Sequence, residues 1–296
     1  MIDLHMHSKC SDDGEFSPTE LVRQCKEAGI TVMSITDHNT VRGNEEAKQA
    51  ANELQIQYVP AIEIDCTIEG VDMHLLGYRI NDESPDFEQI DRNVMTQEKD
   101  ASRKRLKLTN QLGFELSEAE LSEVASLDEY TSVWTGEIFA ELLLAKEEYK
   151  DNELLLPYRE GGARADNPYV NFYWDYYSQG KPCYAKINFP SLADAISIIK
   201  DNGGKAVFAH PGIIIKNNFE LFDKAVSLGI DGVEVFCSYH DTETAKFYYE
   251  LALKNSLLAT CGSDYHGKNK PAVKLGGSGC WLSMDEMKAQ LSSILS

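Results

Sequence analysis

The chain has 296 residues and is 43% hydrophobic, which is enough core for two ordinary domains or for one α/β barrel. Its 28 Lys and Arg against 48 Asp and Glu give a formal net charge of −20, which argues against charge-driven binding of long nucleic acid but is compatible with a small phosphorylated ligand. No apolar run approaches the roughly 18 residues of a membrane span. This absence predicts no membrane contact. The seven cysteines include no C-x-x-C pair, so we expect reduced thiols in a cytoplasmic protein.

Strands and helices alternate over the first 80 residues. The helix pattern predicts helices over 18–28 and 41–54, and apolar runs predict strands over 2–7, 31–36, 58–63 and 71–78. Ser17, Pro18 and Glu20 match a helix N-terminus with a capping box, and Gly29 matches a C-terminal stop.

The pattern changes over residues 81–181, which predict a helical insertion. We expect helices over 87–112, 117–125 and 136–149 and no strand in this segment. The segment contains 22 acidic and 11 basic residues, so about half of the net negative charge lies in a third of the chain. An aromatic run over 169–177 follows, and we expect it to pack against the strands of the barrel, with a ligand platform or a dimer contact as the alternative.

Alternation returns after residue 182. We expect helices over 191–202, 219–228 and 241–254, strands over 206–210, 232–236 and 257–261, and a last helix that begins at a capping box from Ser283 to Glu286. Strands that alternate with helices indicate parallel βαβ units. We therefore predict one α/β barrel built from residues 1–80 and 182–296 and interrupted by the insertion.

Histidines and carboxylates gather at the predicted strand ends. His5 and His7 share one face of the first strand, because side chains two apart on a strand point the same way. The carboxyl ends of barrel strands meet on one face, so we expect these side chains to converge. The candidate metal ligands are His5, His7, Asp12, His38, Glu63, His74, His210, Asp264 and His266.

Imidazole and carboxylate groups suit Zn, Mn or Fe. Nine candidates are too many for one ion and match two or three ions with a bridging carboxylate. Each residue alone has an ordinary explanation, such as a capped loop histidine or a solvated carboxylate. The whole set at strand ends is what favours a metal cluster.

Four segments resemble motifs of the PHP (polymerase and histidinol phosphatase) family. They are DLHMHS at 3–8 followed by SDDG at 11–14, ITDHNTV at 35–41, VFAHPG at 207–212, and GSDYHG at 262–267. The chain is most similar to stand-alone PHP phosphatases with a helical insertion, such as nucleoside 3′,5′-bisphosphate phosphatases. The resemblance covers about residues 1–80 and 182–280.

This resemblance implies a distorted (β/α)7 TIM-like barrel with a trinuclear centre. One ion would take His5, His7, Glu63 and Asp264; a second Glu63, His74 and His210; a third Asp12, His38 and His266. Asp37 would orient a ligand from outside the centre. Water activated by the metals would attack phosphorus in line, with no protein nucleophile.

We therefore expect a metal-dependent phosphatase that acts on a small phosphomonoester such as a nucleotide. The alternatives are a histidinol-phosphate phosphatase, a PHP exonuclease, and a metal-binding regulatory module without catalysis. The charge of −20 counts against the nuclease, and the intact ligand set counts against the regulatory module. The sequence leaves the native metal, the physiological substrate and the oligomeric state open.

Substrate contacts are predicted at two places. The basic cluster Arg103, Lys104 and Arg105 in the acidic insertion could hold a second anion of the substrate, or it could be a solvated helix face. His240 follows a predicted strand and could bind phosphate or protonate the leaving group. Relatives of the bisphosphate phosphatase type carry a histidine near residues 132–137, and this chain has none there, so a bisphosphonucleotide substrate is in doubt. Trp134 in this stretch could stack on a base, although packing of the insertion is the simpler interpretation.

Overall fold

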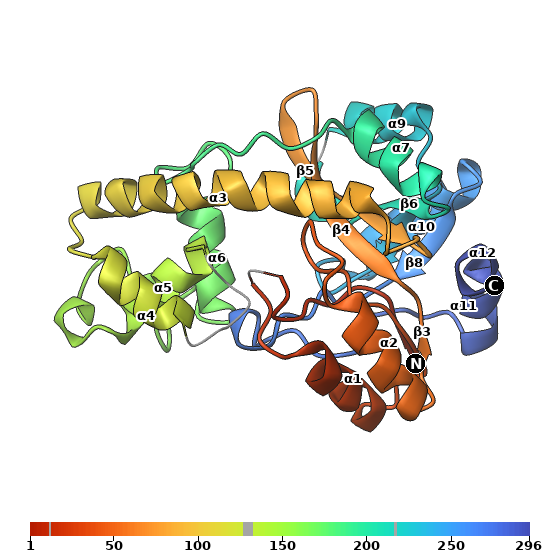
Figure 1. The fold of residues 1–296 in the computed structure, drawn as a ribbon, viewed down its shortest axis with the longest axis horizontal. Coiled ribbons are helices and arrows are strands. Elements are labelled where there is room, and N and C mark those ends of the chain that lie inside the picture. The colour runs from red at the N-terminus through yellow and green to blue at the C-terminus, as the bar shows by residue number, and fades with distance from the viewer. Residues whose placement is uncertain (12, 127–132, 216–217) are drawn as a thin grey trace.

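The computed structural model describes residues 1–296 except residue 12, residues 127–132 and residues 216–217. Strands lie at the centre of one lobe with helices outside them, and the helices of the insertion extend away as a second lobe (Figure 1). The predicted α/β class is confirmed. In the described part of the chain, no helix combines the length and apolar character needed to cross a bilayer.

The described strands form two sheets rather than one. The first sheet is parallel, in the order β1 (Ile2–Asp3), β2 (Val32–Met33), β3 (Gln57–Tyr58). The second sheet has the order β4 (Ala61–Ile68), β5 (Val71–Tyr78), β6 (Lys205–Phe208), β7 (Gly232–Phe236), β8 (Leu258–Cys261). Its first two pairings are antiparallel and its last two are parallel. The parallel units expected from alternating strands and helices are confirmed for β6, β7 and β8.

The antiparallel pair is a tight hairpin. Glu69 and Gly70 both have positive φ, +51° and +81°, as both central residues of a tight two-residue hairpin turn require. The hairpin extends β4 to Ile68, so Glu63 lies inside a strand and not at its end as expected. Because residues two apart on a strand share a face, Glu63 and Asp65 point to the same side of the sheet.

Backbone contacts join the outer strands of the two sheets. An isolated bridge links His38 to Glu63, another links Met6 to Tyr265, and the Leu4 N–H donates to the Cys261 carbonyl at 3.0 Å. These contacts bring the ends of β1, β2 and β8 beside β4. The described strands do not form one continuous closed sheet, so the closed (β/α)7 barrel is not confirmed.

Helices cover the strands on the outside. They are α1 (Pro18–Glu27), α2 (Asn44–Glu53), α7 (Leu192–Asp201), α8 (Pro211–Ile214), α9 (Phe219–Leu228), α10 (Thr242–Lys254), η3 (Gly267–Asn269), α11 (Met284–Gln290) and α12 (Ser292–Leu295). Ser17 accepts from the Glu20 N–H at the start of α1, and Ser283 and Glu286 form the predicted capping box of α11. The main core includes Val207 and Phe208 of β6 and Phe222 of α9.

The insertion consists of helices and has its own core. Its elements are α3 (Pro85–Gln111), α4 (Glu118–Ser126), α5 (Gly136–Ala145), η1 (Glu147–Tyr149), η2 (Leu156–Tyr158) and α6 (Pro168–Tyr176). The start of α3 packs into the main core through Phe87, and its end packs into the insertion core (Figure 1). Phe139, Phe172 and Tyr177 lie in that second core, so the aromatic run packs within the insertion and not against the strands as expected. Trp134 also packs there.

Candidate metal centre

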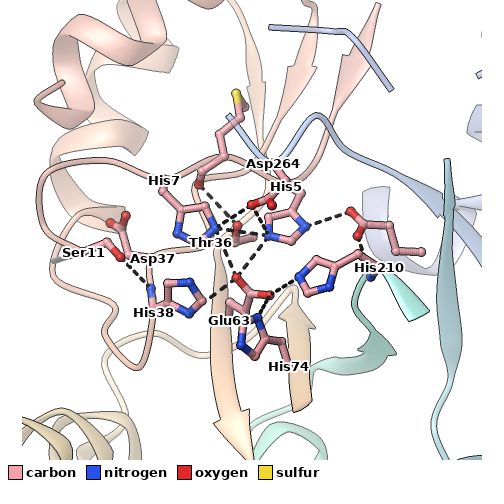
Figure 2. A network of polar contacts seen from close by, with 12 residues as sticks. His5, His7, Ser11, Thr36, Asp37, His38, Glu63, His74, His210 and Asp264 are labelled. Carbon is pink, nitrogen blue, oxygen red and sulfur yellow. Dashed lines mark hydrogen bonds and ion pairs between the residues drawn. The ribbon is translucent and has the colours of Figure 1, made fainter. Parts of the chain in front are cut away.

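Six of the seven histidines lie close together with Glu63 and Asp264. Figure 2 shows five of these histidines, all except His266, gathered around the two carboxylates. His5 and His7 follow β1, His38 follows β2, and His210 follows β6. Asp264 and His266 follow β8, whereas Glu63 and His74 come from the β4–β5 hairpin. The predicted convergence therefore holds for these eight residues, although two of them reach the centre from the middle of an antiparallel hairpin.

Glu63 lies at the middle of the cluster and is completely buried. Its Oε2 is 3.1 Å from both His5 Nε2 and His7 Nε2. Its Oε1 is 3.1 Å from His74 Nδ1 and 3.2 Å from His210 Nε2. Each carboxylate oxygen thus faces a different pair of imidazoles, which is the arrangement of a carboxylate that bridges two ions.

The first ligand group consists of His5 Nε2, His7 Nε2, Glu63 Oε2 and Asp264 Oδ1. Asp264 Oδ1 is 3.2 Å from each of the two imidazole nitrogens, and those nitrogens are 3.2 Å apart. Ligand atoms about 2.1 Å from one ion lie about 3.0–3.4 Å from one another in octahedral or tetrahedral geometry. The spacing of these four atoms therefore fits a single divalent ion.

Two further groups lie on either side. Glu63 Oε1, His74 Nδ1 and His210 Nε2 form the second. Asp13 joins His38 and His266 in the third, with Asp13 Oδ2 2.9 Å from His266 Nε2 and 3.6 Å from His38 Nε2. The sequence prediction placed Asp12 in this group, and Asp12 lies outside the described residues. The adjacent Asp12 and Asp13 gave no sequence signal that distinguishes them.

The charges of the cluster suit cations, because its central carboxylate is held as an anion. Burial opposes ionisation of Glu63, yet His5, His38 and His74 hold its pKa well below the ordinary value. Burial lowers the pKa of His266 to about 4, which keeps its imidazole neutral and able to bind a metal. His266 Nε2 is buried without a hydrogen-bond partner although Asp13 is close, as expected for two ligands that point at a common ion. The residues present therefore fit divalent metal ions.

A family model for the PHP domain matches residues 3–178, which is more than half of the chain. The chain belongs to the PHP domain family. This membership, together with the His and carboxylate groups, assigns it to the metal-dependent phosphoesterases at the level of reaction class.

Three curated relatives match this PHP protein over most of its length. A phosphoribosyl 1,2-cyclic phosphate 1,2-diphosphodiesterase from Eggerthella lenta is 26% identical over 90% of this chain and 94% of its own. A 5′-3′ exoribonuclease from Haemophilus influenzae is 26% identical over 89% of each chain. A 3′,5′-nucleoside bisphosphate phosphatase from Chromobacterium violaceum is 27% identical over 93% of this chain and 90% of its own.

Two solved structures share the fold. One is an amidohydrolase from Chromobacterium violaceum with bound sulfate, with a TM-score of 0.76, 24% identity, and coverage of 98% of this chain and 96% of its own. The other, from Bifidobacterium adolescentis, is assigned as a metal-dependent phosphoesterase, with a TM-score of 0.75, 25% identity, and coverage of 99% and 96%. These alignments cover nearly the whole chain, the insertion included.

Carboxylates and carbonyls outside the ligand groups fix the imidazoles of this PHP protein. Glu234 Oε1 accepts from His5 Nδ1 at 2.8 Å, and the Asp264 carbonyl accepts from His266 Nδ1 at 2.9 Å. Each contact leaves the other ring nitrogen with its lone pair toward the centre. Sequence reasoning missed Glu234, although a buried acid in the apolar run 232–236 is a signal that could have identified it.

Backbone strain accompanies two ligands. His210 and Asp264 have φ of +25° and +56°, in a region of positive φ that is uncommon for residues other than glycine. Before Asp264, a Cβ on Gly262 would lie 2.1 Å from His5 Cβ, so only glycine allows the loop after β8 to approach the first strand this closely.

Lys270 and Tyr239, which were not predicted, fix the far side of Asp264. Lys270 Nζ is 2.7 Å from Asp264 Oδ2, and the Tyr239 hydroxyl donates to the same oxygen at 2.6 Å. The carboxylate therefore offers Oδ1 to the first ligand group while Oδ2 is held by the protein.

Asp37 contacts Ser8, the residue that follows the ligand His7, and lies outside the three ligand groups. Its carboxylate accepts from the Ser8 N–H and the Ser8 hydroxyl, both at 2.7 Å, and so fixes the turn that follows His7. Burial raises the pKa of Asp37 to about 6. Its effect on the centre passes through the position of His7, and we assign it no catalytic step.

The structure gives no support to the prediction that His240 binds phosphate or donates a proton. Its Nδ1 donates to the Val235 carbonyl at 2.8 Å, and its Nε2 accepts from the Gly212 N–H at 3.0 Å. Burial lowers the pKa of His240, which favours the neutral ring that these two contacts need. His240 thus supports the loop after His210 from behind, and neither ring nitrogen is available to a substrate.

The basic cluster on α3 divides into buried and exposed parts. Arg105 is 8% exposed and forms a bidentate ion pair with Glu98, with Nη2 to Oε1 at 3.0 Å. The Arg103 side chain is 65% exposed and lies 3.7 Å from Asp100, and Lys104 is exposed. The carboxylate of Glu98 already occupies the guanidinium of Arg105, so the expected grip on a second substrate anion is not supported at that residue.

Proposed function

We propose that this PHP protein hydrolyses a small phosphomonoester of the nucleotide type, using two to three divalent ions, Mn, Zn or Fe, held by the cluster around Glu63. The observation that carries the proposal is the bridging position of Glu63, whose two oxygens face separate imidazole pairs at 3.1–3.2 Å. Asp13 takes part among the described residues, and with it nine residues make up the three ligand groups.

Bound divalent ions supply Lewis acidity toward phosphoryl oxygens and make water a better nucleophile at neutral pH. The protein's part is to hold the ligands at fixed separations. Glu63 sets the distance between two groups, and Lys270 and Tyr239 prevent Asp264 from rotating. Such preorganised contacts need no rearrangement as charge develops on the phosphoryl group.

Water is the nucleophile that the site favours. Burial raises the pKa of the Cys10 thiol to about 12 and holds that of the Cys237 thiol well above its ordinary value. Both thiols therefore stay protonated and are poor nucleophiles at neutral pH. Direct hydrolysis follows from the metal cluster without a covalent intermediate on cysteine.

The relatives support the substrate class. The three curated relatives carry names that describe a phosphoribosyl cyclic phosphate, RNA and a nucleoside bisphosphate, and each of these contains phosphorylated ribose. The net charge of −20 argues against long RNA in this chain. A small ribose phosphate is therefore the substrate class that agrees with both the relatives and the charge.

The test is release of inorganic phosphate with Mn²⁺ from nucleoside monophosphates, nucleoside 3′,5′-bisphosphates and histidinol phosphate. A ribose cyclic phosphate and a 5′-phosphorylated RNA oligonucleotide are assayed alongside by chromatography of the products, because cleavage of a diester releases no inorganic phosphate. We expect turnover of at least one small ribose phosphate and none of the oligonucleotide. Turnover of the oligonucleotide alone would establish the exonuclease instead. Bound metal without any hydrolysis would establish the regulatory alternative.

A further inference from the structure

Asp65 lies beside the centre but belongs to none of the three ligand groups described above. It follows Glu63 by two residues on β4, and its backbone pairs with that of His74 across the hairpin. Its Oδ1 is 3.1 Å from His38 Nδ1 and 3.4 Å from His74 Nε2. One oxygen thus lies between two imidazoles that face different ligand groups.

Asp65 faces His38 Nδ1 and His74 Nε2, the ring nitrogens that do not take part in the three ligand groups. A neutral imidazole has one N–H and one lone pair. His38 turns Nε2 toward Asp13, and His74 turns Nδ1 toward Glu63. If those nitrogens carry lone pairs toward cations, the opposite nitrogens carry protons, and both protons point at Asp65.

The Asp65 carboxylate is itself held in place. Asn39 Nδ2 donates to Asp65 Oδ2 at 2.8 Å, and the Asp65 N–H donates to Asn39 Oδ1 at 3.0 Å. The Asn39 N–H also donates to the Glu63 carbonyl at 2.7 Å, and Asn39 has a φ of +57°. Asparagine tolerates this left-handed conformation better than most residues, so the segment after His38 can fold back onto β4.

We infer that Asp65 is a positioning residue that couples two metal-ligand groups, because it fixes the tautomer and orientation of His38 in the third group and of His74 in the second at once. This inference rests on the proposed function, since it takes the cluster to hold divalent ions. A carboxylate behind a ligating histidine contributes roughly 10–100-fold to metal affinity. Here a single carboxylate serves two groups, so its loss weakens two ions together.

A separate ion between His38, Asp65 and His74 is the rival interpretation, because their ligand atoms also lie close together. Such an ion would take the lone pairs of His38 Nδ1 and His74 Nε2. The third group would then lose His38 and keep Asp13 and His266, with His7 Nδ1 also close to Asp13. The second group would keep Glu63 and His210. The two interpretations therefore predict different numbers of ions lost when Asp65 is changed.

The experiment compares Asp65→Asn with wild-type protein and with Asp72→Asn. Asp72 lies on the neighbouring strand β5, where it accepts from the Tyr184 hydroxyl at 3.2 Å, so the control removes one charge without removing an imidazole contact described above. Zn²⁺ and Mn²⁺ are titrated against a competing chelator, with bound metal counted by elemental analysis. We expect Asp65→Asn to weaken two ions roughly 10–100-fold each and to leave the His5 and His7 ion unchanged.

A second readout separates positioning from stability. Long-range ¹H–¹⁵N spectra of the zinc-loaded protein report which nitrogen of His38 and His74 carries the proton. We expect Nδ1–H at His38 and Nε2–H at His74 in wild-type protein and in Asp72→Asn, and a changed pattern for both rings in Asp65→Asn. Melting of the metal-free proteins should agree within a few degrees.

The outcomes are distinct. Loss of one ion with the other two unaffected would overturn the inference in favour of the separate ion. Unchanged affinities and tautomers in Asp65→Asn would overturn it outright. Wild-type protein that binds several ions without hydrolysing a phosphate ester would overturn the proposed function alone, and wild-type protein that binds fewer than two ions would overturn both.

Discussion

Replacing Glu63 by glutamine changes the one side chain that two ligand groups share. The substitution keeps the size of the side chain and removes its charge from between imidazoles that lie 3.1–3.2 Å away. An amide offers one acceptor oxygen, so it cannot bridge, and both groups lose an anionic ligand.

The magnitude follows from the number of groups affected. Loss of even an outer partner of a ligand costs roughly 10–100-fold in affinity or activity, and Glu63 acts directly in two groups. Taking that range once for each group gives a loss of roughly 10²–10⁴-fold in kcat/KM, or about 2.7–5.4 kcal/mol of transition-state stabilisation.

The assay is phosphate release from the best small substrate at saturating Mn²⁺, with circular dichroism of each variant. Glu69→Gln is the matched control, because Glu69 undergoes the same change on the same hairpin but is exposed at the turn. We expect the control to keep wild-type activity. Wild-type activity in Glu63→Gln with an unchanged spectrum would refute the bridging role of this residue.

Three further substitutions test the neighbourhood of the centre. Arg105→Ala leaves Glu98 buried without its cation and should lower the free energy of unfolding by about 3 kcal/mol in urea titrations, whereas the exposed Arg103→Ala should change it by less than about 0.5 kcal/mol. His240→Ala leaves the Gly212 N–H without its acceptor, so it should cost about 1–3 kcal/mol of stability while the pH profile of kcat keeps its shape. Burial, followed by the nearby Asp13 carboxylate, raises the pKa of Glu137 to about 7, so the folded state binds this proton more tightly than the unfolded state does. The contribution of Glu137 to stability should therefore fall as the pH rises from its unfolded pKa of about 4.3 to its folded value, and Glu137→Gln in metal-free protein should flatten the pH dependence of unfolding across that window.

Each of these three predictions is contradicted by a specific result. A selective loss of kcat/KM on doubly anionic substrates in Arg105→Ala, with stability unchanged, would return this residue to substrate binding. Loss of one limb of the pH profile in His240→Ala would restore the general-acid role. An unchanged pH dependence of unfolding in Glu137→Gln would show that the carboxyl is not the group that titrates near neutral pH.

Local signals in the sequence predicted the elements well. Ser17 and Ser283 cap the helices that their patterns indicated, and the predicted strand over 71–78 coincides with β5. These signals arise within a few residues of one another, where hydrogen bonding and side-chain periodicity act without the rest of the chain. The same local logic brought His5 and His7 to one face and predicted that they would meet other histidines.

The tertiary structure decided the contacts between residues that are far apart in the sequence. The Glu69–Gly70 turn made β4 and β5 antiparallel, and this pairing placed Asp65 opposite His74. Burial of Glu234 behind His5 depends on strands separated by more than 220 residues in sequence. Neither pairing has a signature in the local pattern, because register and topology come from the packing of the whole core.

The sequence by itself therefore determined the α/β class, the helical insertion and the residue types that assemble a metal centre, because composition, periodicity and motif spacing encode them locally. Only the tertiary structure decided which polar side chains form hydrogen bonds or ion pairs within the protein and which face the candidate metal centre. It paired both nitrogens of His240 with backbone groups and the guanidinium of Arg105 with Glu98, whereas Asp13 and Asp65 face the histidines. The role of a side chain depends on which polar groups lie within hydrogen-bond distance of it in the folded core. Those distances cannot be read from the spacing of residues along the chain.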